Sequence, residues 1–267
     1  MQKRIWAGLI YSFMILGWMV SMVWAGDLTG RQIIEEQQDR HIADNEYSDV
    51  NLTLVDRKGK EKHQKMVIYT SKKEGKTRTL IQYHAPANIR GVGLLTWEQG
   101  KDKDDDQWLY MSAARSTKRI AGGSKKNQFM GTDMAFEDMR PENLDTHKYT
   151  LVGEEMMGDK NCWKIESFPS TEKEKKDSGY GKRVMWVDQS NYMTLKVDYY
   201  DHHDRHIKIA LFEDIRPMSG KLFRSFKVTW NRIRQKTTTI MDYKKIDLDT
   251  RHKDIMFSQN YMKRPIR

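Results

Sequence analysis

The feature that most constrains this chain is a period-two alternation of apolar and polar side chains, which begins near Tyr47 and continues toward the C-terminus. In the run 193–199, for example, apolar Met, Leu, Val and Tyr side chains alternate with Thr, Lys and Asp. Because successive side chains of a β-strand point to opposite faces, this pattern predicts strands with one apolar face. Roughly a dozen such runs follow one another, joined by short polar turns such as 159–161 and 188–191.

Strands that follow one another through short turns form an antiparallel sheet in meander order, so we expect a mainly β protein. A sheet of this size must curl into a barrel or remain partly open with helices covering its concave face. Either arrangement leaves an apolar hollow. No internal repeat or linker interrupts residues 26–267, and the lysine-rich segment 171–179 is typical of an exposed loop, so we predict a single domain.

One amphipathic helix is predicted before the strands, over Leu28–Ile42. Ile33 and Ile34 lie on a modest apolar stripe of this otherwise charged segment. Asp27 or Thr29 is the expected N-cap, because a short polar side chain accepts hydrogen bonds from the N–H groups of the first turn.

Residues 1–25 have the features of a secretory signal peptide. Lys3 and Arg4 precede a long uncharged apolar stretch, and Ala25 is small enough for a signal-peptidase site. We therefore expect cleavage near Gly26 and a mature protein in the periplasm. An uncleaved membrane anchor is the alternative, since the apolar stretch approaches the ~18–20 residues that span a bilayer.

Charge and cysteine content limit the remaining possibilities. Cleavage removes Lys3 and Arg4 and no acidic residue, which lowers the formal net charge from +10 to +8. A basic surface suits anionic lipid headgroups or an acidic partner, and export makes nucleic acid an unexpected partner. Cys162 is the only cysteine, so no internal disulfide can form and the core alone must stabilise the fold.

The middle of the chain carries its most specific motifs. They are Asn88-Ile89-Arg90-Gly91-Val92-Gly93-Leu94-Leu95, then Asp106-Gln107-Trp108-Leu109-Tyr110, then Arg119-Ile120, and finally Phe129-Met130-Gly131-Thr132-Asp133-Met134-Ala135-Phe136-Glu137-Asp138-Met139. This succession resembles the outer-membrane lipoprotein-sorting protein family, which is similar to the periplasmic lipoprotein carrier LolA. The likeness covers nearly the whole mature chain.

The resemblance implies a LolA/LolB-like incomplete antiparallel β-barrel, a half-barrel whose concave face is capped by helices and binds lipid or acyl chains. It also implies association with inner-membrane exporters of the RND or MMPL type. The function that it implies is lipid-binding transport, as a chaperone in outer membrane biogenesis.

The predicted lipid cavity consists of large apolar side chains of the alternating strands. They are Leu95, Trp97, Trp108, Tyr110, Trp163, Met193, Leu195, Val197, Phe226, Val228 and Trp230. Packing of an ordinary core beneath the helix is the alternative for each of them. The abundant methionines suit a wall that accepts variable ligands.

The segment Phe129–Met139 interrupts the strand alternation, so we expect a loop or short helix folded against the mouth of the sheet. A lid or partner-docking role is predicted for it, with a purely structural corner as the alternative. The residues assigned to this role are Phe129, Met130, Asp133 and Phe136, with Asp133 as the expected N-cap.

Motifs for metal binding and catalysis are weak. The histidines of 201–206 lie in an expected hairpin tip, and the acidic run 102–106 lacks the glycine and terminal glutamate of an EF-hand, so no metal site is assigned. The sequence contains no nucleophile elbow, no HExxH motif and no phosphate-binding loop. We expect no enzyme and no cofactor.

These observations predict a periplasmic carrier that takes lipoprotein acyl chains or other lipid from an inner-membrane RND/MMPL-type or ABC exporter toward an outer-membrane acceptor. The first alternative is a non-carrier adaptor that docks on an RND/MMPL-type exporter through a sheet edge or the Phe129 loop. The second is a periplasmic hydrolase or metalloprotein, which bound zinc would reveal.

Overall fold

The computed structural model describes residues 28–100 and 103–266. The predicted signal peptide 1–25 and the alternative N-cap Asp27 lie outside the described residues. Within the described part, thirteen strands form one sheet. They are β1 (Asn45–Val55), β2 (Glu61–Lys73), β3 (Lys76–Ala85), β4 (Gly93–Trp97), β5 (Asp106–Met111), β6 (Ser116–Arg119), β7 (His147–Met157), β8 (Lys160–Pro169), β9 (Lys182–Asp188), β10 (Thr194–Tyr200), β11 (His206–Ser219), β12 (Leu222–Arg232) and β13 (Thr237–Asp247).

The sheet is an antiparallel meander in two halves, with the order β6-β5-β4-β3-β2-β1-β13-β12-β11-β10-β9-β8-β7. The first strand pairs with the last, for example Leu52 with Met241, so the two halves join in the middle and β6 and β7 become the edges. The sheet is therefore open, and the predicted incomplete antiparallel barrel is confirmed.

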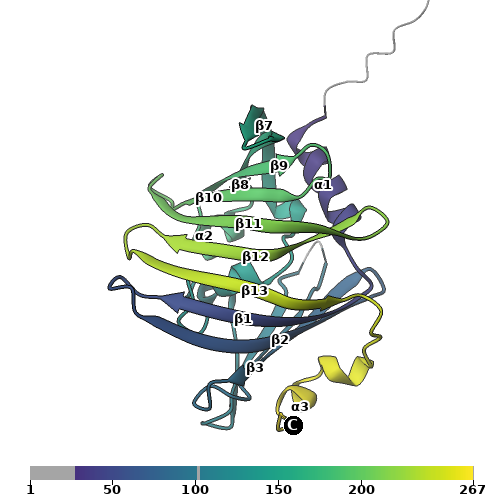
Figure 1. Ribbon diagram of the computed structural model, residues 1–267, viewed down its shortest axis with the longest axis vertical. Coiled ribbons are helices and arrows are strands. Elements are labelled where there is room, and N and C mark those ends of the chain that lie inside the picture. Colours follow the sequence, from purple (N-terminus) through teal and green to yellow (C-terminus); the bar gives the residue numbers. More distant parts are fainter. Residues whose placement is uncertain (1–27, 101–102, 267) are drawn as a thin grey trace, which may run out of the picture.

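Helices and irregular segments lie on both faces of this curved sheet. The helices are α1 (Gly30–His41), α2 (Glu172–Asp177) and α3 (Gln259–Met262), with the 3-10 turns η1 (Gly122–Ser124), η2 (Phe136–Met139), η3 (Leu144–Thr146) and η4 (Asp254–Phe257). Of these, η4 and α3 lie on the face opposite the others. In Figure 1, α2 and the segment that joins β6 to β7 lie behind the central strands, and α1 runs behind the ends of β9 to β12. We call this joining segment, residues 120–146, the roof segment.

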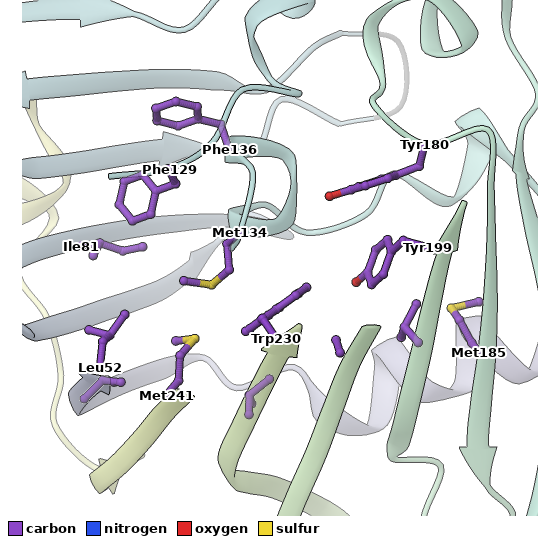
Figure 2. Packing of buried hydrophobic residues seen from close by; sticks show 14 of the residues in the cluster. Leu52, Ile81, Phe129, Met134, Phe136, Tyr180, Met185, Tyr199, Trp230 and Met241 are labelled. Atoms are coloured by element: carbon purple, nitrogen blue, oxygen red, sulfur yellow. The ribbon is translucent and has the colours of Figure 1, made fainter. Parts of the chain in front are cut away.

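The main core lies between the sheet, α1 and the roof segment. It combines Ile33 and Ile34 of α1 with inward side chains of the strands and with Phe129, Met134 and Phe136 of the roof segment (Figure 2). We call the sheet face that carries this core the inner face. Because strand residues alternate, the neighbours of these side chains point to the outer face.

The outer face has two smaller clusters. Leu80 and Leu95 pack with Phe257 and Met262 of the C-terminal segment, and Cys162 packs with Val184 and Trp186. Cys162 is thus a packing residue, and burial raises the pKa of its thiol to about 11. Among the described residues, no helix has the length and apolarity needed to cross a bilayer.

The predicted N-terminal helix is confirmed with Thr29 as its N-cap. The Thr29 hydroxyl accepts from the Gln32 N–H at 3.2 Å, and the Gln32 side chain accepts from the Thr29 N–H at 2.9 Å, which is a reciprocal capping box.

Replacing Thr29 by Ala should lower the free energy of unfolding by about 1 kcal/mol, measured by urea denaturation. The exposed Ser116→Ala should change it by less than about 0.5 kcal/mol; equal effects of the two substitutions would refute the capping role.

Candidate functional site

A cavity of about 530 Å³ lies on the inner face between the sheet and the roof segment. Its floor is apolar and comes from both halves of the sheet. The floor residues are Ile68 of β2, Phe212 of β11, Val228 and Trp230 of β12, and Met241 of β13. The opposite wall consists of Met134 and residues 137–143 of the roof segment, with residues of the loop that contains α2.

A largely buried ion pair, with 17% and 19% of its side-chain surfaces exposed, fixes the C-terminal part of the roof segment to the sheet. The Glu142 carboxylate pairs with the Arg183 guanidinium of β9 and also accepts a hydrogen bond from the Tyr149 hydroxyl. Arg183 also donates to the Ser167 hydroxyl at 3.3 Å. Burial alone raises the pKa of Glu142, but the positive charge of Arg183 brings that pKa below its usual value.

A second buried pair holds the middle of the roof segment. The Lys208 ammonium of β11 lies 2.5 Å from the Asp138 carboxylate and also donates to the Tyr180 hydroxyl oxygen. Its nitrogen lies 4.6, 4.4 and 4.8 Å from the ring centroids of Tyr180, Tyr199 and Trp230, so three aromatic faces surround the ammonium. Figure 2 shows these three rings close to one another within the core cluster. Burial lowers the pKa of Lys208, and Asp138 opposes this effect.

Further polar contacts join the roof segment to the loop that contains α2. Lys125 and Glu174 form a buried ion pair at 2.6 Å. The Glu137 carboxylate accepts from the Ser178 hydroxyl at 2.7 Å and from the Gly179 N–H at 2.8 Å. Burial raises the pKa of Glu137. The roof segment is therefore attached through charged and hydrogen-bonding groups, whereas the cavity floor is apolar.

Asp133 attaches the roof segment to β13. Its carboxylate accepts from the Thr237 and Thr239 hydroxyls at 2.5 and 2.8 Å. The expectation that Asp133 caps a short helix is wrong, because η2 begins after Ala135, whose N–H is satisfied by Asp138 at 2.6 Å. Asp133 instead links two segments that lie far apart in the sequence.

The structure does not place the eleven residues of the predicted lipid wall on one face. Val228 and Trp230 line the cavity, Val197 lies in the inner core, and Trp163 packs at the edge of that core against Tyr192, with ring centroids 4.8 Å apart. Phe226 lies in β12 with the Arg216 guanidinium 4.1 Å from its ring, and Met193 is half-buried outside the three clusters.

Five of the eleven are corrected to the outer face. Leu95, Trp97, Trp108 and Tyr110 belong to the cluster covered by Phe257 and Met262. Leu195 packs with the Cys162 cluster, because a β-bulge between Thr194 and Lys196 changes the alternation assumed for β10. The large apolar side chains of these strands therefore pack on both faces of the sheet, and only those on the inner face can contact a guest in the cavity.

The roof residues assigned to a lid or docking role lie mostly in the core. Phe129 is completely buried, Phe136 and Asp133 are nearly so, and Met130 is half-buried. Phe129 contacts Tyr83 and Phe136 with ring centroids 5.9 and 5.5 Å apart. The segment folds against the sheet, as predicted, and fills part of the concavity.

Sequence reasoning missed the charged residues of the cavity. The sequence did contain a sign of Arg183 and Lys208, because each charged residue occupies an inward position where the alternation calls for an apolar one. Arg183 lies two residues before the buried Met185, and Lys208 lies two residues before the buried Ala210. Asp105, to which the sequence analysis gave no role, lines the cavity with its carboxylate 3.5 Å from the Arg140 guanidinium, and burial raises its pKa.

The described residues contain no group of three His, Cys, Asp or Glu side chains arranged to hold a metal ion. The segment 201–205 forms the expected turn between β10 and β11, where the His202 ring contacts the Ser178 carbonyl at 2.9 Å. The acidic run 102–106 is described only from Lys103 onward.

The fold is shared with solved structures. An outer membrane lipoprotein-sorting protein domain from Vibrio parahaemolyticus is 23% identical with a TM-score of 0.82, and the match covers 88% of this chain and 98% of that one. A DUF1329 family protein from Desulfovibrio piger is 26% identical with a TM-score of 0.81, over 87% of this chain and 97% of that one. A LolA superfamily protein from Nitrosomonas europaea is 18% identical with a TM-score of 0.66, over 88% and 99%.

These similarities define the class of the protein as a LolA-like open β-barrel. A family model whose description reads "Uncharacterized protein" matches residues 75–264, more than half of the chain. The chain belongs to the family that this model defines. Its fold is that of the outer-membrane lipoprotein-sorting domain and of the LolA superfamily protein, which confirms at the level of the fold the resemblance found in the sequence. No curated protein matches the chain.

Proposed function

We propose that this protein is a periplasmic carrier that holds an acyl chain of a lipoprotein or another lipid in the inner-face cavity. The observation that carries the proposal is the cavity of about 530 Å³ with its apolar floor, a size within the range of roughly 300–1,000 Å³ typical of small-molecule sites. An acyl chain that leaves water for this floor gains about 0.8 kcal/mol per buried CH₂ group.

Two buried donors on the cavity lining support a guest that also carries oxygen. Trp230 Nε1 and Arg140 Nε have no hydrogen-bond partner among the described residues, and both side chains line the cavity. A buried unsatisfied donor costs about 1–3 kcal/mol, so an ester or amide carbonyl near the head of an acyl chain is a suitable acceptor.

The proposed transport begins at an inner-membrane exporter of the RND/MMPL or ABC type and ends at an outer-membrane acceptor. The similarity to the Vibrio parahaemolyticus domain, which is described as an outer membrane lipoprotein-sorting protein, supports such a path. The proposed role requires neither catalysis nor a cofactor, and the direction of transport comes from the exporter or from an affinity gradient.

Of the two roles predicted for the roof segment, burial supports a lid and not a docking surface. Phe129, Asp133 and Phe136 face the core, so a partner cannot reach them while the roof is closed. Met134 and residues 137–143 form a wall of the cavity, so a guest that enters from this side must displace them.

Filling the cavity should weaken lipid binding. We expect Val228→Phe to reduce the affinity for a fluorescent fatty acid by about tenfold, because the larger ring occupies the space of two or more CH₂ groups of the guest. The affinity is measured by titrating the probe with purified protein. Mass spectrometry of lipid extracted from freshly isolated protein shows separately whether the protein retains lipid.

Val184→Phe is the matched control, because Val184 and Val228 have the same 5% exposed fraction and Val184 lies in the outer-face Cys162 cluster. Both substitutions should cost about 1–3 kcal/mol of stability through overpacking, but only Val228→Phe should weaken binding. A wild-type protein that neither binds the probe nor retains lipid would refute the carrier function.

The adaptor alternative has one favourable observation. The edge strand β7 has exposed Val152 and Met156, at 47% and 59% of their full exposure, and its outer edge is free of sheet partners among the described strands. Cross-linking at position 156 that captures an exporter, in a Val228→Phe variant that still supports growth like the wild type, would favour the adaptor over the carrier.

A further inference from the structure

A second cleft of about 440 Å³ adjoins the cavity and is strongly basic. It lies where the β10–β11 and β12–β13 turns meet the roof segment. Its cationic side chains are Lys126, Arg205, Lys208, Arg232 and Arg234, against two carboxylates, Asp133 and Asp201.

Three of these cations have no counter-charge among the described residues. Asp201 pairs with Arg205 at 2.7 Å, and Lys208 pairs with Asp138. Within residues 28–100 and 103–266, Lys126, Arg232 and Arg234 form no ion pair. The cleft therefore has an excess of positive charge, which favours the binding of an anion.

The cleft and the cavity share a wall. Tyr180 and Met134 line both hollows. Asp138 lines the cavity and Lys208 lines the cleft, and their 2.5 Å ion pair forms part of the partition. A molecule with its apolar tail in the cavity and its anionic head in the cleft must therefore pass over or displace this partition, part of which, Met134, belongs to the roof segment.

We propose that the basic cleft binds the phosphate-bearing, anionic headgroup of the lipid whose tail enters the cavity. This inference rests on the proposed carrier function and adds the chemical class of its cargo. Arginine suits the role because its planar guanidinium gives two parallel hydrogen bonds to a phosphate. Arg232 and Arg234, at the end of β12 and in the turn after it, are the principal ligands.

Three lipids with the same single acyl chain test the proposal: lysophosphatidic acid, zwitterionic lysophosphatidylcholine and neutral monoacylglycerol. Each is titrated below its micelle concentration against the full mature protein. We expect lysophosphatidic acid to bind most tightly. Replacing Arg232 and Arg234 together by Ala should weaken its binding by about tenfold or more, since charge-assisted hydrogen bonds to phosphate are lost, and should leave monoacylglycerol binding unchanged.

The control variant replaces Arg251 and Lys253 by Ala, which removes two exposed cations beyond the opposite end of β13. This variant should bind all three lipids like the wild type. Equal affinity of the wild type for the three lipids, or equal weakening by the two double variants, would overturn the headgroup assignment. So would binding of inorganic phosphate that depends on Arg232 and Arg234 in a protein that fails to bind lysophosphatidic acid.

The failure of the headgroup site and the failure of the carrier function give different results. If monoacylglycerol binds and lysophosphatidic acid has no advantage, the carrier function survives and the headgroup site does not. If no lipid of the series binds, the carrier function itself fails and the headgroup assignment fails with it.

Discussion

Replacing Arg183 by Met is expected to lower the free energy of unfolding by about 3–5 kcal/mol. The substitution keeps most of the side-chain volume but leaves the largely buried Glu142 carboxylate with the Tyr149 hydroxyl as donor and the His147 ring 3.9 Å away. An uncompensated buried charge is far more costly than the pair itself is stabilising. The measurement is urea denaturation near neutral pH.

The pH dependence of stability provides an independent check on the same pair. Because the pKa of Glu142 is lowered in the folded protein, the pair's contribution is fully present above the ordinary glutamate pKa of 4.5 and is lost as the pH falls below it. In Arg183→Met the Glu142 carboxylate loses the largest effect that lowers its pKa, so its pKa should rise and its protonation should restore stability. The difference between wild type and variant should therefore shrink in acid.

Arg216→Met is the matched control, because Arg216 pairs with Asp214 on the surface. Loss of an exposed pair should change the free energy of unfolding by less than about 1 kcal/mol. Adding Glu142→Gln to Arg183→Met should recover part of the loss. A similar cost for Arg183→Met and Arg216→Met, or a difference from wild type that grows in acid, would refute the role of the buried pair.

Replacing Phe129 by Ala should also lower the free energy of unfolding by about 3–5 kcal/mol. Phe129 is completely buried between Tyr83 of the sheet and Phe136 of the roof segment, as Figure 2 shows for the roof residues. Its removal takes away the transfer free energy of the ring and leaves a hollow that the rigid sheet cannot close. Because the ring fastens the roof, the variant should also release a bound fatty-acid probe faster than the wild type.

The neighbouring Met130 supplies the comparison. It is half-buried, so Met130→Ala should cost clearly less stability than Phe129→Ala and should leave the rate of probe release close to that of the wild type. Thermal denaturation and stopped-flow release measure the two properties separately. If the Phe129→Ala protein were as stable as the Met130→Ala protein, the roof segment would not be part of the core.

The sequence alone predicted the elements whose causes are local. Strands follow from alternation along a few residues, and the cap at Thr29 follows from one side chain and the three residues after it. Short polar turns join neighbouring strands, which is why the meander could be predicted before the structure. The motifs between Asn88 and Met139 carried the family resemblance and with it the open barrel.

Only the tertiary structure decided which face of a strand is inside. Leu95 and Trp97 were predicted to line the lipid cavity, but they pack on the outer face beneath the C-terminal segment. Alternation reports that two faces differ, not what packs on each, and a single bulge moves Leu195 to the other face. The pair of Asp138 and Lys208, separated by 70 residues, was equally hidden, because nothing local to either residue specifies a partner that only the folded chain brings within reach.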